Sequence, residues 1–180
     1  MQITAKSTRE EVLAAVSRGG WELMFASDEL RDDREIVMAA VTDRPWALEV
    51  ASDELRNDRE IVLAAVSGSG WALEFASENL RNDREIVLAA VKENGLDSGW
   101  GLRFASEELR NDWEIVLAAV KENGLALQYA SEELRDDQEI VLAAICKDVW
   151  AIDFASDALR NNREILIAVV AGGGSVYNKP

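Results

Sequence analysis

The sequence predicts an all-α protein: a right-handed-type α-solenoid of about six two-helix repeats of 25 residues, preceded by an N-terminal half repeat. Three observations support this prediction. One motif returns at a fixed spacing, each copy carries a helix-start signature, and each copy contains an apolar run rich in alanine. A fixed period of roughly 20 to 50 residues is typical of arrays whose units bury their apolar faces only against neighbouring units. The chain of 180 residues is therefore interpreted as one extended domain.

An Ala-Ser pair marks the period. It recurs at steps of 25 residues, with one step of 29. The alanines of the pair are Ala26, Ala51, Ala76, Ala105, Ala130 and Ala155. We accordingly expect a single repeat domain over residues 1–171 and a Gly-rich tail over 172–180. The predicted half repeat covers 7–20, and the predicted full repeats cover 21–45, 46–70, 71–99, 100–124, 125–149 and 150–171.

The second half of each repeat, for example residues 80–91, is predicted to form an inner helix. A Ser, Asp or Asn followed three residues later by Glu is the capping-box pattern, which satisfies free N–H groups at a helix start. This pattern predicts N-caps at Ser7, Asp32, Asn57, Asn82, Asn111, Asp136 and Asn161. The run that follows is apolar on every side, which indicates burial between neighbours. A buried strand is the alternative for so short a run, and the paired alanines favour the helix.

A short connection follows each inner helix and often ends in glycine. At Gly20 and Gly70, left-handed backbone geometry is expected to close the preceding helix. A segment of the form Trp-x-Leu-x-Phe-Ala-Ser comes next, as in residues 71–77, and is predicted to form an outer helix. Its aromatic positions form a ladder, which would suit either ligand stacking or packing. The helical spacing, together with the tolerance of Val50 and Leu125 at these positions, favours packing.

Residues that depart from the repeat pattern are the candidate partner contacts. Leu96, Asp97 and Ser98 belong to a four-residue insertion ahead of Trp100. Loops accept insertions at low cost and often carry functional contacts. Trp113 stands where other copies have Arg or Gln, and it is expected to be exposed and available to a partner. A neutral variation in loop length and a drifted repeat copy are the alternatives.

The two ends of the array differ. Glu11 replaces the isoleucine of the other inner helices, which suits a cap facing solvent. The last inner helix is as apolar as the interior ones, and no further repeat follows it in the sequence. We therefore expect Ile165, Ile167 and Val169 to contact a partner. A partner subunit, a second copy of the chain or the folded-back tail would cover them.

One arginine recurs without variation where the two predicted helices of a repeat meet. Its copies are Arg31, Arg56, Arg81, Arg110, Arg135 and Arg160. We interpret them as donors to carbonyl groups of the outer helix and to neighbouring carboxylates. A groove for an acidic ligand is the alternative.

Composition and charge bound the classes of partner. The formal net charge of −15 argues against nonspecific binding to nucleic acid or to an anionic membrane. It accommodates a basic protein partner, although an acidic surface also serves simply to keep an array in solution. No apolar run reaches the roughly 18 residues needed to insert across a bilayer. The chain start shows no secretory signal and Cys146 is the single cysteine, so the location is left open with an intracellular one favoured.

The sequence contains no histidine, which removes the commonest general base and metal ligand. The acidic turns lack the ligand spacing of a calcium loop, and we expect no metal and no cofactor. These features favour a noncatalytic protein-interaction scaffold or a structural subunit of a larger assembly. An enzyme or enzyme accessory is the alternative, and its site would be built from Asp97, Ser98, Trp113 and Cys146.

The complete motif, Trp-x-Leu-x-Phe-Ala-Ser-x-x-Leu-Arg-Asn-Asp-Arg-Glu-Ile-Val-Leu-Ala-Ala-Val-Lys-x-Asn-Gly, is long enough to be specific. It resembles the repeat of domain-of-unknown-function family 4116 over roughly residues 8–170. The resemblance implies a helical repeat protein with no assigned activity. It supplies no catalytic or binding residues to carry over to this chain.

Overall fold

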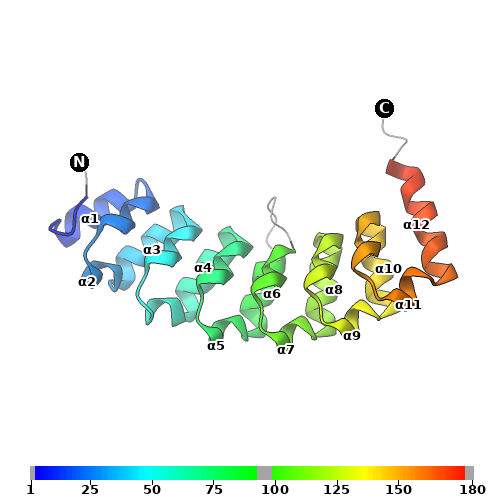
Figure 1. Ribbon diagram of the computed structural model, residues 1–180. Helices are drawn as coiled ribbons and strands as arrows, with labels where there is room; N and C mark the ends of the chain where they lie inside the picture. Colours follow the sequence, from blue (N-terminus) through cyan, green and yellow to red (C-terminus); the bar gives the residue numbers. More distant parts are fainter. Residues whose placement is uncertain (1–2, 93–98, 177–180) are drawn as a thin grey trace.

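The computed structural model describes residues 3–92 and 99–176, with side chains as far as residue 171. Every regular element within these ranges is helical, and the elements form one row of stacked repeats (Figure 1). The prediction of an all-α solenoid is confirmed. The long helices of the row are α1 (Arg9–Val16), α3 (Arg34–Asp43), α4 (Arg59–Gly68), α6 (Arg84–Lys92), α8 (Trp113–Glu122), α10 (Gln138–Lys147) and α12 (Arg163–Val176).

Each full repeat has three helical segments where the sequence predicted two. A 3₁₀ helix comes first, a helix of about one turn follows, and the long helix completes the repeat. The 3₁₀ helices are η1 (Gly20–Phe25), η2 (Pro45–Val50), η4 (Gly70–Phe75), η5 (Trp100–Phe104), η6 (Gly124–Tyr129) and η7 (Val149–Phe154). The short helices are α2 (Asp28–Arg31), η3 (Leu55–Asn57), α5 (Glu78–Arg81), α7 (Glu107–Arg110), α9 (Glu132–Arg135) and α11 (Asp157–Arg160).

The predicted outer helix is broken at the Ala-Ser pair. Ala76 and Ser77 have extended backbone, with ψ of 155° and 158°, so the chain changes direction between η4 and α5. The break directs the N–H of Ser77 to the carbonyl oxygen of Arg56 in the preceding repeat, at 2.9 Å. The same bond joins Ser52 to Arg31, Ser106 to Arg81, Ser131 to Arg110 and Ser156 to Arg135. A continuous outer helix would use this N–H internally, so the bond between repeats explains the break.

The N-caps of the long helices lie one residue later than the capping-box pattern predicted. The observed caps are Thr8, Asp33, Asp58, Asp83, Asp112, Asp137 and Asn162. The predicted caps were wrong at Ser7, Asp32, Asn57, Asn82, Asn111, Asp136 and Asn161. Thr8 forms a capping box with Glu11. In α3 and the later long helices, the Glu that recurs in each repeat is the second residue of the helix. A capping box needs it at the third residue, so it cannot reach back to the cap.

Most of the residues predicted as caps instead link one repeat to the next. The hydroxyl of Ser77 donates to Oδ1 of Asn57 at 2.5 Å, and it accepts from the N–H of Leu80 at 3.3 Å. It therefore caps its own short helix and ties that helix to the preceding repeat. Equivalent serine hydroxyls donate to Asp32, Asn82, Asn111 and Asp136. We call this series the serine ladder.

Close approach of the backbone, and not left-handed geometry, explains the glycines that open the 3₁₀ helices. Among the described glycines, Gly99 alone has a positive φ, of 80°. A Cβ on Gly70 would lie 2.2 Å from the carbonyl oxygen of Ala90, and one on Gly20 would lie 2.4 Å from that of Ala40. Both glycines thus lie directly against the long helix that follows. The expected left-handed closure at Gly20 and Gly70 was wrong.

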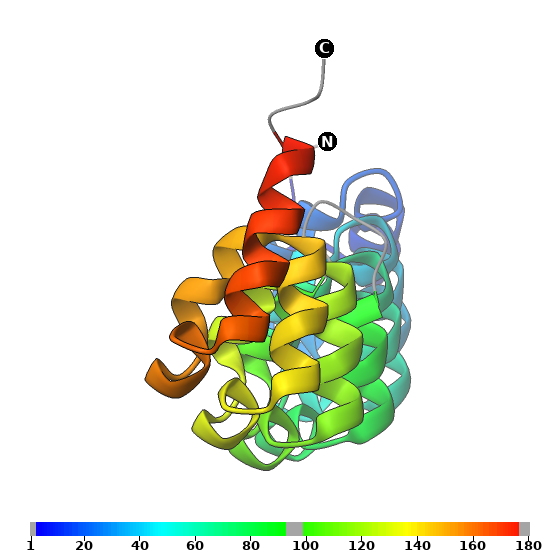
Figure 2. The same cartoon turned by 90° about the vertical axis from the view of Figure 1, so that its right-hand side faces the viewer.

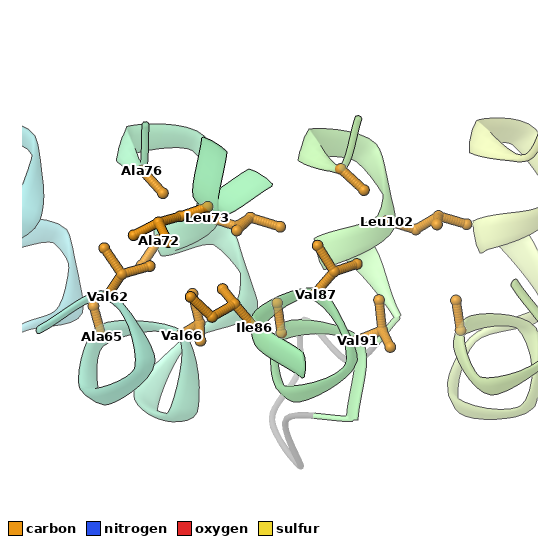
Figure 3. Packing of buried hydrophobic residues seen from close by; sticks show 14 of the residues in the cluster. Val62, Ala65, Val66, Ala72, Leu73, Ala76, Ile86, Val87, Val91 and Leu102 are labelled. Atoms are coloured by element: carbon orange, nitrogen blue, oxygen red, sulfur yellow. The ribbon is translucent and has the colours of Figure 1, made fainter. Parts of the chain in front are cut away.

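The core is a continuous apolar layer between the row of long helices and the row of 3₁₀ helices. In Figure 3, Val62 and Val66 of α4, Leu73 of η4 and Ile86 of α6 point into this layer, and all of them are fully buried. Neighbouring long helices contact each other, as do neighbouring 3₁₀ helices. Viewed along the row, the long helices lie one behind another (Figure 2). Each repeat therefore buries its apolar side against the repeats before and after it.

None of the described helices is both long enough and apolar enough to span a membrane.

Replacing Ser77 by alanine is expected to lower the free energy of unfolding by about 1–2 kcal/mol, because the change removes a helix cap and the bond to Asn57. Urea denaturation followed by circular dichroism measures the loss. Ser67→Ala is the matched control, since the Ser67 hydroxyl donates to Leu63 within its own helix and alanine favours helix. Equal losses in the two variants would contradict the role of the serine ladder.

Candidate functional site

Ion pairs cross the junctions between long helices at the N-terminal ends of those helices. Arg34, the first residue of α3, pairs with the N-cap of α4, Asp58, at 3.0 Å from Nε to Oδ2, and it also pairs with Glu60. We call this arrangement an arginine clamp. In it, the guanidinium of one repeat pairs with an Asp and a Glu of the next repeat, and these two acids are two residues apart in the sequence. The same clamp is formed by Arg9, Arg59 and Arg84, at 2.6, 3.4 and 3.2 Å from Nε to the aspartate.

The clamps favour ionised aspartate. The hydrogen bond from Arg9 holds the pKa of Asp33 below its ordinary value, against the opposing effect of burial. Burial acts to raise the pKa of Asp58, but hydrogen bonds from a backbone N–H and from Arg34 outweigh it and the pKa is lowered. The pKa of Asp112 is lowered for the same reasons. These carboxylates therefore stay ionised at lower pH in the folded chain than in the unfolded chain.

The series of clamps is interrupted at Trp113. This residue is the first of α8, the position that Arg84 holds in α6. The two acids of the next clamp are nevertheless present, because Asp137 caps α10 and Glu139 follows two residues later. No described cation forms an ion pair with either acid. Trp113 is 36% exposed and lies outside the hydrophobic core, so the sequence prediction that it is exposed agrees with the structure.

The last repeat exposes positions that are buried in all earlier repeats. Leu166 and Val170 of α12 are 45% and 76% exposed, whereas the equivalent Val141 and Ile145 of α10 are 0% and 2% exposed. Trp150, at the start of the last 3₁₀ helix, is 68% exposed. We call Trp150, Leu166, Ile167 and Val170 the C-terminal face. No following repeat covers it among the described residues, whereas the positions equivalent to Leu166 and Val170 are buried in the earlier repeats.

The three partner contacts predicted for this end of the row all lie on α12, and the structure exposes only one of them. Ile167 is 58% exposed, as expected for a partner contact. Ile165 is fully buried and Val169 is half-buried against the core, so neither is freely available. The positions of Leu166 and Val170 face the next repeat. The position of Ile165 faces the preceding repeat.

Comparison with protein families places these features in a known group. A family model described as Domain of unknown function (DUF4116) matches residues 8–56, 35–80, 58–98, 96–135 and 137–178. The chain belongs to this family. No curated protein and no solved structure matches the chain. The resemblance inferred from the repeat motif is thereby confirmed, and membership brings an architecture without an assigned activity.

The family matches are longer than the structural repeat. They span 40 to 49 residues, counted from the first to the last residue of each range, whereas the repeat period is 25. Each match therefore includes at least one junction between consecutive repeats. The pattern that characterises the family is thus a pattern of junctions as much as of helices.

The remaining candidate contacts are dispersed. Leu96, Asp97 and Ser98 lie outside the described residues. Cys146 is exposed near the end of α10, whereas Trp113 lies at the start of the neighbouring α8. Because α8 and α10 lie side by side and run parallel to each other, these two residues are at opposite ends of the long-helix layer (Figure 1). The structure does not bring Trp113 and Cys146 together.

The aromatic ladder packs across the junctions. The rings of Trp71 and Trp100 stack with centroids 5.9 Å apart, and Trp46 lies 6.3 Å from Trp71. The guanidinium of Arg103 lies 5.6 Å from the Trp71 ring and 5.4 Å from that of Phe104. These rings are half-buried on the outside of the 3₁₀ layer, so they pack between repeats and not in the centre of the core.

The recurring arginines at the short helices agree only in part with the prediction: two donate to carbonyl groups and four pair with a carboxylate three residues earlier, while the buried Nε atoms of Arg31, Arg56, Arg81 and Arg110 have no acceptor among the described residues. Arg31 donates to the carbonyl oxygen of Met24 at 2.8 Å, and Arg135 donates to that of Phe154 in the next repeat at 2.5 Å. Arg110 pairs with Glu107 of its own short helix at 3.8 Å. The cleft of about 460 Å³ beside Arg110 is lined by glutamates as well as arginines, which does not suit an acidic ligand.

An open groove of about 830 Å³ is lined mostly by residues of α3, among them Arg34, Met38, Ala39 and Thr42. Among the described residues, no three His, Cys, Asp or Glu side chains lie together in a way that would hold a metal ion.

Stability should fall on acidification because of the clamped aspartates. A carboxyl whose pKa is lower in the folded state stabilises the fold above its unfolded pKa, about 3.9 for Asp, and this contribution is lost as pH falls through the folded pKa. Asp58→Asn keeps an N-cap acceptor and removes the charge that Arg34 binds. We expect it to lower the free energy of unfolding at pH 7 and to flatten the decline below about pH 4. Denaturant unfolding at a series of pH values measures both effects.

Asp137→Asn is the control for this measurement, because Asp137 caps its helix but pairs with no arginine among the described residues. We expect a smaller loss of stability at pH 7 than for Asp58→Asn. A loss as large at Asp137 would show that capping, and not the clamp, accounts for the effect.

Proposed function

We propose that the protein is a noncatalytic interaction scaffold or a structural subunit of a larger assembly, and that a protein partner or a second copy of the chain packs on its C-terminal face. The observation that carries the proposal is the exposure of Leu166 and Val170, at 45% and 76%. Side chains at the same positions in the earlier repeats are at most 2% exposed. Burying an aliphatic side chain of this size contributes about 1.5–3 kcal/mol, so an apolar helix placed on this face would be stabilised there.

The polar half of a junction is also available at this end. In the preceding repeat, the carbonyl of Arg135 accepts from the N–H of Ser156, and Asp136 accepts from the Ser156 hydroxyl. The equivalent carbonyl of Arg160 and side chain of Asn161 have no following serine among the described residues. This arrangement favours a partner that resembles a further repeat, with a backbone N–H and a hydroxyl opposite α11 and an apolar helix opposite α12.

Arg163 is equivalent to the arginines that form clamps in earlier repeats. It is the first residue of α12, the position from which Arg34 forms a clamp with the following repeat. An Asp and a Glu at the start of the partner helix would complete a clamp with Arg163. Apolar, backbone and charged groups of the C-terminal face therefore favour the same kind of partner.

Replacing Leu166 by Glu and Val170 by Lys in one variant is expected to abolish association through the C-terminal face. The change charges the apolar surface, while a Glu followed four residues later by Lys supports a helix. Sedimentation velocity at about 1–100 μM, and capture of partners on the immobilised chain, compare the double variant with the wild type.

Ala14→Lys, beside Glu10 at the exposed side of α1, is the control for added charge at the other end of the row. It should associate as the wild type does. A wild-type chain that stays monomeric throughout this range and captures the same proteins as the double variant would contradict the proposal.

A further inference from the structure

The four intact clamps show which group is missing from the interrupted clamp at Trp113. In the clamps of Arg9, Arg34, Arg59 and Arg84, the acceptors are an aspartate that caps a long helix and a glutamate two residues later. Each such pair holds one guanidinium, with Nε directed to the aspartate and Nη2 to the glutamate. The carboxylate pair is thus an arginine-binding unit that this chain uses repeatedly.

The unit at α10 keeps its aspartate in place without an arginine. Oδ1 of Asp137 accepts from the N–H of Ile140 at 2.9 Å, just as Oδ1 of Asp58 accepts from the N–H of Ile61 at 3.1 Å. Capping therefore positions the aspartate independently of the ion pair. Glu139 follows two residues later in the first turn of the same helix, which is the position of the glutamate in the intact clamps.

The junction between α10 and α12 also lacks a clamp, but for a different reason. There Gln138 takes the place of the arginine and Asn162 takes the place of the aspartate, and Gln138 donates to Glu164 at 2.7 Å. Both the donor and the capping acceptor become neutral together. At Trp113 the donor has changed while both acids are retained, which leaves two negative charges uncompensated. Loss of the arginine alone leaves both acceptors without a positively charged donor among the described residues.

Trp113 adds a surface that suits the missing group. A guanidinium stacks favourably on an aromatic face, and tryptophan is the strongest such acceptor. This protein already makes that contact, since the Arg103 guanidinium lies 5.6 Å from the Trp71 ring. Trp113 is 36% exposed and is not packed into the core, so its ring is accessible to a ligand.

The surroundings favour an arginine that belongs to a protein segment. Leu117 and Leu142 lie one turn further along α8 and α10, and both are half-buried on the same side of the row. They offer apolar contacts to residues on either side of a bound arginine. The net charge of −15 attracts a basic partner over a longer range.

We propose that Trp113, Asp137 and Glu139 form a receptor for one arginine side chain of a partner protein. The bound guanidinium donates to Asp137 and Glu139 in the manner of Arg84 with Asp112 and Glu114, and its plane rests on the indole ring. Lysine fits less well because its ammonium is a single point donor without the planar fork. The receptor is separate from the C-terminal face, so either proposal can fail without the other.

The test is an NMR titration of the ¹⁵N-labelled full chain with N-acetylarginine amide, and with N-acetyllysine amide for comparison. We expect arginine to shift the indole N–H signal of Trp113 and the amide signals of Glu139 and Ile140, with an affinity about tenfold above that of lysine. Asp137→Asn combined with Glu139→Gln should lose this binding, while Asn at the cap retains the helix start.

Two exchanges between neighbouring repeats provide matched variants. Trp113→Arg restores the residue found in other copies, and it is expected to fill the receptor from within, lose the arginine-induced shifts and raise the midpoint of urea unfolding. Arg84→Trp should create a second receptor at Asp112 and Glu114, with new arginine-induced shifts there. Equal shifts with arginine and lysine, or arginine binding that is unchanged in Trp113→Arg, would overturn the proposal.

Sedimentation of the Trp113→Arg variant identifies the source of the arginine. Self-association equal to that of the wild type supports a different protein as the partner. Loss of self-association in this variant would instead assign the arginine to a second copy of the chain and overturn the partner assignment.

Discussion

Burial of apolar side chains across the junction between consecutive repeats is the interaction on which this structure depends. A helix of about ten residues is marginal in water by itself, and most helical stability comes from packing. Val62 and Val66 become fully buried only because α6 and its 3₁₀ helix lie against them. Each repeat therefore depends on its neighbours, and within the described residues the repeat that contains α12 presents the surface that a further repeat would cover.

The polar contacts of the junction have a different effect from the apolar ones. Exposed ion pairs such as Arg34 with Asp58 contribute little stability compared with buried valines and isoleucines. Their contribution is directional, because the serine ladder and the arginine clamps form only when successive repeats are in one register. Ser77 illustrates this, since its N–H and its hydroxyl both bond to residues 56 and 57 of the preceding repeat. Apolar burial thus drives stacking, and the polar ladders select how the repeats stack.

The same division explains what could be predicted from the sequence. The period and the long helices follow from apolar patterning within one repeat, and they were predicted correctly. Burial on every side of the long helix was wrong, because Leu63 and Ala64 are only half-buried. The break at the Ala-Ser pair and the bond from Ser77 to Asn57 depend on another repeat, so the pattern within one repeat indicated a cap at Asn57, whereas Asp58 caps the helix. A signal was present in the sequence: Arg34 precedes Asp58 by 24 residues and Glu60 by 26, and Arg9 and Arg59 have acids at the same two separations. These repeated separations of opposite charges indicate the clamps.

A chain of nearly identical repeats has little means of specific recognition except where the junction changes. In the clamped junctions the acids are neutralised by the protein's own arginines, so a basic ligand gains little there. At the C-terminal face the junction lacks its apolar partner, and at Trp113 it lacks its cation while keeping both acceptors. The two departures require different chemistry: an apolar helix end at one, and a single guanidinium at the other. The proposed partners are therefore defined by what each of these two junctions lacks, and the intact junctions show which groups those are.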